Sequence, residues 1–320
     1  GGERVNMGVL CWRRVSRTGV SVAWPALEPG KWVFDKHARL TFADLDARPA
    51  RDMIPSATFS RVEERATPSR WHSVDHTGDL GLSAKWGLTD TITLDATVNP
   101  DFSQVESDAF QVELNQRFPV YYSEKRPFFM EGAGIFNLAG NGQGDASMLY
   151  AVNTRNIVDP ILGAKQTGSI GRMTFGTLTA VDQATGRTDD PDDPLRGKEK
   201  LFQVARAQWS LKPGSYAGAM ATFTTLNGRR NAVAGADVNL QFKGAQRLSA
   251  FLLGSTTDDD PDGGDGNGVA LQANYSFNSR RVSVASQVEH YDRGFAMDTA
   301  FLNRTGITNA WGYVDYNFYP

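Results

Sequence analysis

The feature that most constrains the fold is a two-residue alternation of apolar and polar side chains, which recurs from Asp79 onward. Over 79–86 the even positions hold Leu, Leu, Ala and Trp, and after a short turn at 87–90 the alternation resumes over 91–98. A period of two is that of a β-strand with one apolar face, so this region predicts an amphipathic hairpin. Similar strands are expected at 236–242, 269–277 and 282–289, and less regular ones around 170–181, 201–211, 216–225, 248–254 and 310–318.

The connections between these segments differ in length. Two short turns, 243–246 and 278–281, contrast with two long polar connections, 182–200 and 256–268. Short turns at one end and long loops at the other are typical of bacterial outer-membrane barrels. The predicted fold is therefore all-β, an antiparallel up-and-down outer-membrane-type β-barrel with an inserted loop. Since we count about ten or eleven strands and closed barrels usually have an even number, we expect the N-terminal part of a larger barrel.

The polar face of these strands is mostly uncharged Ser, Thr, Asn, Gln and Gly. A soluble β-sandwich would carry more charges on its outward faces, whereas such residues suit the lumen of a barrel. We therefore favour a bacterial outer-membrane location with lipid as a partner, and keep a soluble β-sandwich binding module as an alternative. Six aromatic residues near strand ends are expected to form interfacial girdles. They are Trp86, Trp209, Tyr216, Tyr275, Trp311 and Tyr319.

Composition argues against several other classes of protein. The net charge of -3 and the pI of about 5.9 give no basic face for nucleic acid. Cys11 is the one cysteine, so there is no intramolecular disulfide. No cofactor or metal site is expected: the His72 and His76 spacing needs a helix but precedes a strand, and the calcium-like run 258–263 has Val269 where a carboxylate is required.

The chain is expected to have two parts. Residues 1–51 resemble the tail of a small β-domain with a linker, because they lack sustained alternation. Residues 52–320 form the barrel region, with an inserted loop at about 99–153. The stretch 46–70 contains Pro49, Pro55 and Pro68, so we expect a connector that ends in the first barrel strand.

The inserted loop holds the candidate site residues. The charged and aromatic residues of this loop are compatible with two interpretations. The loop could form a constriction of the barrel, or a buried ion-pair network could hold it in place, and we favour the ion-pair network. Arg126 is expected to bind the carboxylate of Glu106 or Glu131, because a guanidinium can make two parallel hydrogen bonds. The binding or loop-anchoring candidates are Asp101, Glu106, Asp108, Glu124, Lys125, Arg126, Phe128, Phe129 and Glu131.

Four motifs resemble those of a bacterial family. They are N-P-D-F-S-Q-V-E-S-D at 99–108, S-E-K-R-P-F-F-M-E-G at 123–132, L-G-A-K-Q-T-G at 162–168 and R-T-G-I at 304–307. Over about 55–320 the chain is similar to the domain-of-unknown-function family 5916, which usually follows a family-9-type carbohydrate-binding domain. The resemblance implies an outer-membrane β-barrel, preceded here by the end of the carbohydrate-binding domain.

Two functions remain open at this point. A pore or a surface-binding barrel, with carbohydrate as a candidate ligand, needs no catalytic group, and we favour it over an enzyme. A cell-surface glycoside hydrolase would instead use two acids about 5 to 10 Å apart, at least one of them unpaired. Its candidates are Asp101, Glu106, Asp108 and Glu113. The sequence leaves the ligand, the oligomeric state and the total strand number open.

Overall fold

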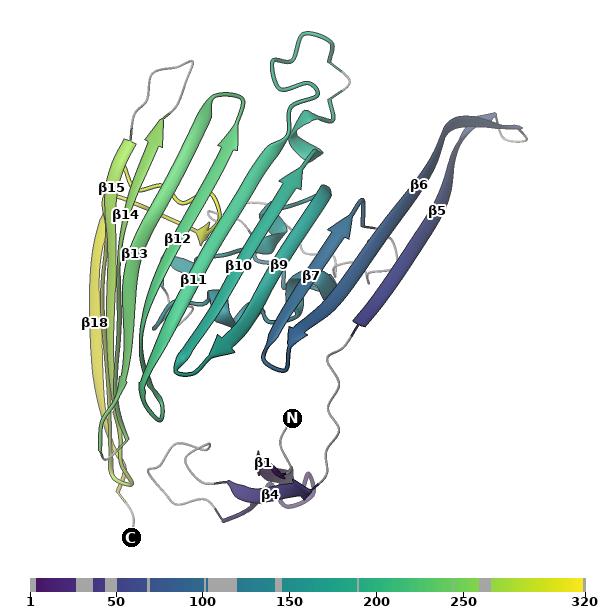
Figure 1. Cartoon of the computed structure of the whole chain (residues 1–320). Coiled ribbons are helices and arrows are strands. Elements are labelled where there is room, and N and C mark those ends of the chain that lie inside the picture. The colour runs from purple at the N-terminus through teal and green to yellow at the C-terminus, as the bar shows by residue number, and fades with distance from the viewer. Residues whose placement is uncertain are drawn as a thin grey trace.

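One antiparallel sheet dominates the computed structural model, which describes residues 4–26, 37–43, 51–67, 70–100, 102, 120–141, 146–188, 190–243, 245–258 and 266–318. Twelve strands follow one another around this sheet in chain order, each antiparallel to its neighbours (Figure 1). They are β5 (Arg51–Thr67), β6 (Arg70–Thr89), β7 (Ile92–Val98), β9 (Pro160–Ile170), β10 (Met173–Asp182), β11 (Lys200–Lys212), β12 (Ser215–Leu226), β13 (Arg229–Gln241), β14 (Gln246–Asp258), β15 (Gly266–Asn278), β16 (Val282–Tyr291) and β18 (Ile307–Tyr316).

The sheet is curved and open. Among the described residues, β5 and β18 each have one neighbour in it and do not pair with each other. The up-and-down order and long strands confirm the predicted fold class, an all-β sheet of outer-membrane barrel type that is not closed. No helix in the described ranges is long and apolar enough to span a membrane.

The connections follow the predicted pattern. At the end of the sheet that is lowest in Figure 1, short turns join β9 to β10, β11 to β12, β13 to β14 and β15 to β16. At the other end, the connection from β10 to β11 is long, and β12 turns into β13 through Asn227 and Gly228. Both of these residues have positive φ, at 46° and 94°, as a tight hairpin turn between twisted strands requires.

Two strands differ from the predictions. The stretch 51–67, expected as a connector, is strand β5; its Pro55 is tolerated because β5 is an edge strand, where a missing N–H interrupts no ladder on the open side. The sequence prediction also missed β9, because Gly163, Lys165 and Gly168 interrupt its apolar alternation. The insert between β7 and β9 consequently spans 99–159 rather than about 99–153.

The two faces of the sheet have opposite character. Outward side chains are apolar and exposed, as shown by Leu80 (77 % exposed) and Val314 (70 %). Inward side chains of the adjacent strands β7 and β16 are polar and buried, including Asp95 and Gln287. This distribution is the inverse of that in a water-soluble protein, and it matches the faces predicted for 79–98, 269–277 and 282–289.

The inward row of β10 to β14 is different, since much of it is apolar and buried. Leu178, Phe202, Met220 and Phe251 belong to a core cluster that also includes Phe136 from the insert. The expectation that uncharged polar side chains line the lumen is therefore wrong for this part of the wall. In β10, β11, β12 and β14 both faces carry apolar residues, one row outward and one against the insert, and for this reason their alternation is irregular in the sequence.

The aromatic residues divide between the two faces. Trp86 and Trp209 point outward and are about half exposed, and the register places Tyr275 on the same outward face. Tyr216 and Trp311 instead share the inward face with Asp237 and Gln287, so their assignment to an outer girdle was wrong. Tyr319 lies outside the described residues.

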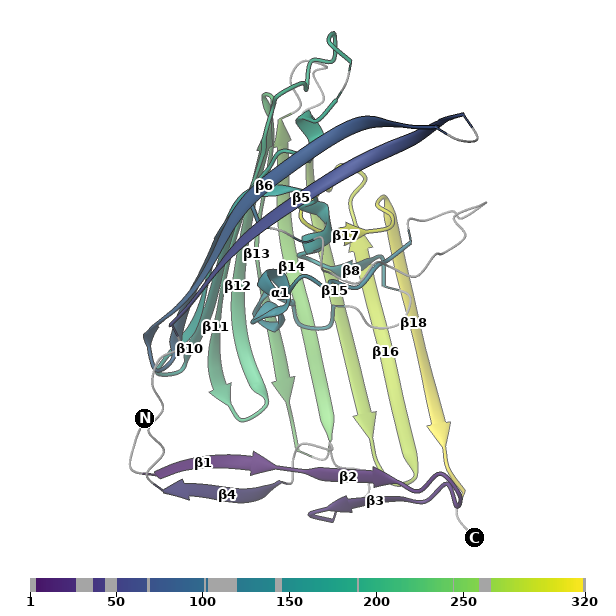
Figure 2. The same ribbon diagram turned by 90° about the vertical axis from the view of Figure 1, so that its right-hand side faces the viewer.

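The N-terminal residues form two small sheets apart from the wall. One pairs β1 (Arg4–Val9) with β4 (Ala38–Ala43), and the other pairs β2 (Cys11–Arg14) with β3 (Ser21–Trp24). Figure 2 shows both beside the short-turn end of the large sheet. Cys11 is exposed and free. A separate domain over 1–51 remains a proposal, although β5 already begins at Arg51.

Candidate functional site: the insert and the wall that holds it

The described parts of the insert, which spans residues 99–159, lie on the concave side of the sheet (Figure 2). Its described parts include helix α1 (Pro127–Met130), two short 3₁₀ helices, η2 (Ala133–Phe136) and η3 (Thr154–Asn156), and strand β8 (Met148–Tyr150). Strand β8 pairs with β17 (Phe301–Leu302), from the loop that joins β16 to β18. Two segments far apart in the chain therefore meet inside the curve of the wall.

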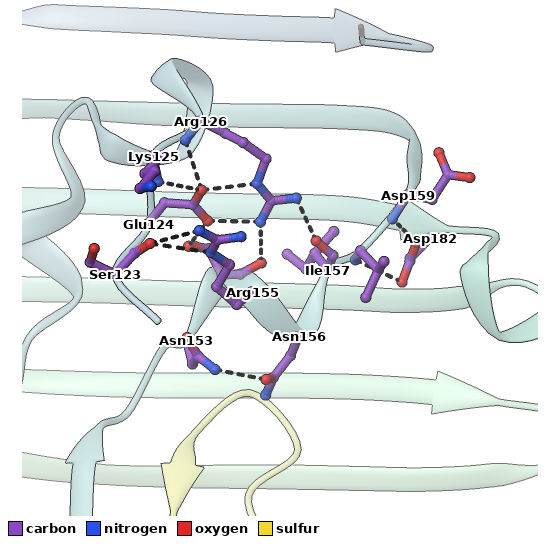
Figure 3. A network of polar contacts seen from close by, with 12 residues as sticks. Ser123, Glu124, Lys125, Arg126, Asn153, Arg155, Asn156, Ile157, Asp159 and Asp182 are labelled. Carbon is purple, nitrogen blue, oxygen red and sulfur yellow. Dashed lines mark hydrogen bonds and ion pairs between the residues drawn. The ribbon is translucent and has the colours of Figure 1, made fainter. Parts of the chain in front are cut away.

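Arg126 organises the first part of the insert. Its Nε and Nη2 donate to the two oxygens of Glu124 at 2.9 and 2.7 Å, and it also donates to the carbonyl oxygens of Ile157 at 2.6 Å and Thr154 at 2.7 Å (Figure 3). The predicted partner Glu131 is wrong, since that carboxylate pairs with Lys85. Arg126 thus joins the beginning of α1 to η3 at the end of the insert.

Glu124 is held in its ionised form. Burial alone would raise the pKa of its carboxyl group, but hydrogen bonds from Arg126 and Thr154 lower that pKa to about 2. The Arg126 guanidinium also lies over the ring of Phe129, 4.3 Å from its centroid, a favourable cation–π geometry. A carboxylate held in this way does not provide the raised pKa of a general acid.

Strand β9 forms the surface on which α1 rests. Lys165 is buried, and its Nζ donates to the carbonyl oxygens of Phe128 and, at 2.6 Å, of Glu131. At Gly163 a Cβ atom would lie 3.0 Å from the ring of Phe128, so the glycine permits the close approach of the insert. The motifs at 123–132 and 162–168 therefore contact each other across the interior.

A buried ion pair holds the middle of the insert. Arg206 of β11 and Asp237 of β13 make two parallel bonds of 2.6 Å, and both side chains are 0 % exposed. Asp237 also accepts from the backbone N–H of Ala139 at 2.8 Å, and Arg206 donates to the carbonyl oxygen of Asn137 at 3.3 Å. The pair thus connects two wall strands to the chain just after η2.

Two further residues of the wall, in β15 and β16, bind the insert farther along the chain. Gln272 donates to the carbonyl oxygen of Gly140 at 2.8 Å. Glu289 accepts from the backbone N–H and the hydroxyl of Ser147 at 3.0 and 3.1 Å. Our sequence analysis missed this role of Lys165, Arg206 and Asp237, although each is a charge in the inward row of a strand.

The loop at 292–306 also contacts the insert. Thr299 accepts from the N–H of Asn153 at 2.7 Å through its carbonyl oxygen. Asp298 binds Arg229, Lys200 at 3.2 Å and Thr224 at 3.0 Å. Burial alone would raise the pKa of Asp298, but these cations lower it below its ordinary value. The loop is therefore fixed to β11, β12 and β13 as well as to the insert.

Replacing Asp298 with asparagine should destabilise the protein by about 1.5 to 3 kcal/mol at neutral pH, because charge-assisted hydrogen bonds are lost while the side-chain shape is kept. The pKa of Asp298 is lower in the folded state, so its stabilisation is present above its ordinary pKa of 3.8 and declines as the pH falls. Urea unfolding in detergent at pH 7 and pH 3 should show a larger difference between variant and wild type at pH 7 than at pH 3. Asp292→Asn, an exposed change in the same loop, is the control and should have a smaller effect; equal effects at both pH values would contradict this assignment.

A cavity of about 990 Å³ separates α1 from the inner face of β5, β6 and β7. Lys85, Asp95, Lys125 and Glu131 line it. Lys85 pairs with Glu131, and Asp95 lies 3.5 Å from Lys165. The cavity thus has charged walls in which Glu131 and Asp95 each lie beside a lysine.

The other predicted site residues divide into two groups. Phe129 is buried, and Phe128 packs edge-on against it with ring centroids 5.0 Å apart. Asp101, Glu106 and Asp108 lie outside the described residues, as does Glu113. Glu124 and Glu131, the described acids of 120–132, are both bound to cations, so neither supplies the unpaired carboxylate that the hydrolase alternative requires.

Comparison with known proteins confirms the resemblance to the family. Residues 58–141, which include the motifs at 99–108 and 123–132, match the family described as "Domain of unknown function (DUF5916)". No curated protein matches the chain.

Three solved structures are similar in outline. The chain resembles the trimer form of in-vitro folded OmpT, an outer membrane protein of Vibrio cholerae, with 7 % identity over 84 % of this chain and 98 % of that one, at a TM-score of 0.35. OccK7 (OpdD) of Pseudomonas aeruginosa shows 11 % identity, and the similarity covers 82 % of this chain and 57 % of OccK7, at a TM-score of 0.32. A mutant porin of Rh. blastica shows 12 % identity, and the similarity covers 98 % of this chain and 90 % of the porin, at a TM-score of 0.22.

Proposed function

Starting from the DUF5916 match, we propose that this chain is the wall and internal plug of a bacterial outer-membrane β-barrel that admits or binds a small polar solute, with carbohydrate as the candidate. The observation that carries the proposal is the inverted polarity of the sheet. Exposed apolar side chains such as Leu80 and Leu252 cover its outside, while buried charges such as Lys165 and Arg206 lie inside. Lipid suits the first surface and a protein-filled lumen the second.

The insert defines what kind of barrel this is. It contacts the inward face of β9, β11, β13, β15 and β16 through the residues described above. A segment bound at so many points narrows the interior instead of leaving a wide channel. We therefore propose a pore of low conductance in the resting state.

A substitution on the outer face tests the membrane location. Leu252 is 56 % exposed at the middle of β14, and Leu252→Arg should reduce insertion into vesicles, since Arg at the bilayer midplane costs about 2 to 4 kcal/mol. Leu211→Arg is the matched control near the end of β11, where the same change costs about 0 to 1 kcal/mol. The measurement is folding of the purified full-length protein into vesicles, followed by gel mobility.

A soluble β-sandwich predicts a different result for Leu252→Arg. In a soluble sandwich, an exposed leucine can be replaced by arginine with little effect, because surface changes usually stay within about 0.5 kcal/mol. If Leu252→Arg folds into vesicles as well as the wild type, the outer face at Leu252 does not meet lipid. If the wild type does not fold into vesicles, or if the full-length protein is recovered from the periplasm without detergent, the membrane proposal is wrong.

A further inference from the structure

Two aromatic side chains occupy the inward face of β18. The register pairs Trp311 with Gln287 and Tyr313 with Ala285, and directly paired residues in an antiparallel ladder point to the same face. That face is the inward one, because Glu289, two residues beyond Gln287, binds Ser147 of the insert. Trp311 and Tyr313 therefore face the concave interior, toward the short-turn end of the sheet.

The two rings are parallel and accessible. Their planes differ by 5° and their centroids are 6.1 Å apart. Trp311 is 37 % exposed and Tyr313 is 51 % exposed, whereas the inward side chains nearer the insert, including Glu289, are buried. The Trp311–Tyr313 pair thus lies where the inward side chains of this wall are no longer buried. Both rings are accessible to a solute.

A buried amide without a partner lies beside the pair. Gln287 is 1 % exposed, and within the described part of the chain neither its Nε2 nor its Oε1 has a hydrogen-bond partner. Buried polar groups are nearly always hydrogen-bonded. An amide that can both donate and accept is therefore present directly across the ladder from Trp311.

The neighbouring inward residues restrict the kind of ligand. Ser283 and Asn309 add uncharged hydrogen-bonding groups, although Asn309 also donates to Glu289 at 3.4 Å. Asp315 is the single charge in the inward rows over 283–287 and 309–315, and Glu289, the next acid, is buried against the insert. A cationic ligand would call for more acids and an anionic one for arginine or lysine. A neutral ligand with apolar faces and many hydroxyl groups fits both the rings and the amides.

We propose that Trp311 and Tyr313 form a carbohydrate-binding surface in the interior, with neutral pyranose rings stacking on the aromatic faces and their hydroxyl groups bonding to Gln287, Asn309 and Asp315. The C–H face of a pyranose is apolar and packs on an aromatic ring, while its hydroxyl groups require donors and acceptors. This inference rests on the proposed function, because it takes the concave face to be the lumen.

The test is titration calorimetry of the full-length protein in detergent micelles with maltohexaose and cellohexaose. Wild type should bind at least one of them, and Trp311→Ala should weaken that binding about tenfold, the loss expected for one stacking contact. Trp209→Ala removes an exposed tryptophan from the outward face and is the matched control, with unchanged affinity. Tyr313→Ala should weaken binding in the same direction as Trp311→Ala.

Each remaining outcome has a defined meaning. Trp311→Phe keeps a flat aromatic ring and should retain most of the affinity for the oligosaccharide. Comparison with this variant therefore distinguishes the loss of the ring in Trp311→Ala from a loss of affinity caused by misfolding. Absence of binding to both hexasaccharides, or equal affinities of Trp311→Ala and wild type, would overturn the proposal. Calorimetry in micelles does not depend on insertion, so failure of the Leu252→Arg test would refute the membrane location separately.

Discussion

Arg206→Ala is expected to destabilise the protein by about 3 to 5 kcal/mol, since it leaves the carboxylate of Asp237 buried without its cation. Both partners are fully buried and joined by two bonds of 2.6 Å. The same change removes the bond to Asn137 and weakens the position of Ala139. We therefore also expect the insert to loosen and the single-channel conductance to rise. Thermal unfolding in micelles and planar-bilayer recordings measure the two effects.

Two variants make this prediction specific. Arg187→Ala breaks an ion pair with Asp159 in which the arginine is 62 % exposed, and a pair of that kind contributes about 0 to 1 kcal/mol. The double variant Arg206→Met with Asp237→Leu replaces the buried pair by apolar groups, and we expect it to regain most of the stability. If Arg206→Ala has the stability and conductance of wild type, the pair does not hold the insert.

Arg126→Ala is expected to destabilise the fold by about 3 kcal/mol, because the buried Glu124 carboxylate loses its cation. In the wild type the pKa of Glu124 falls from 4.5 to about 2 on folding. A lowered pKa stabilises the fold fully above pH 4.5, and this stabilisation disappears as the pH falls toward 2. In the variant, burial without the guanidinium raises the pKa of Glu124, so stability should already decline at higher pH.

Melting temperature measured from pH 7 to pH 2 distinguishes this mechanism from a general loss of packing. The control is Arg155→Ala, which removes hydrogen bonds to the carbonyl oxygen of Ser123 while Glu124 keeps the partners described above. That variant should follow the wild-type pH profile. A profile of Arg126→Ala that runs parallel to the wild type at all pH values would show that Glu124 does not depend on this arginine.

The sequence allowed the outer wall to be predicted better than its interior. Where one face meets lipid and the other carries polar groups, as in β15 and β16, the period of two is visible and the predicted faces are correct. In β10 and β11 the inward Leu178 and Phe202 pack against the insert, so both faces are apolar and the period is blurred. The alternation therefore weakens where the interior is filled with protein.

The partner of Arg126 illustrates a second limit. Several acids surround it in the sequence, and composition cannot select among them. The structure selects Glu124 because its Oε1 also accepts from the backbone N–H of Arg126 at 2.8 Å, so one oxygen serves the side chain and the main chain of the same residue. This local arrangement depends on the backbone path just before α1, which periodicity does not encode.

The attachment points of the insert have a consequence for the order in which the molecule assembles. The insert leaves the wall at β7 and returns at β9, the strand that pairs with β7. Its partners, however, come later: Ser147 binds Glu289, 142 positions farther along the chain. Contacts of such long range form only after the intervening chain has closed on itself. A nascent chain that stops before β16 can therefore already bind the insert through β9, β11 and β13, but it lacks Glu289, which binds Ser147.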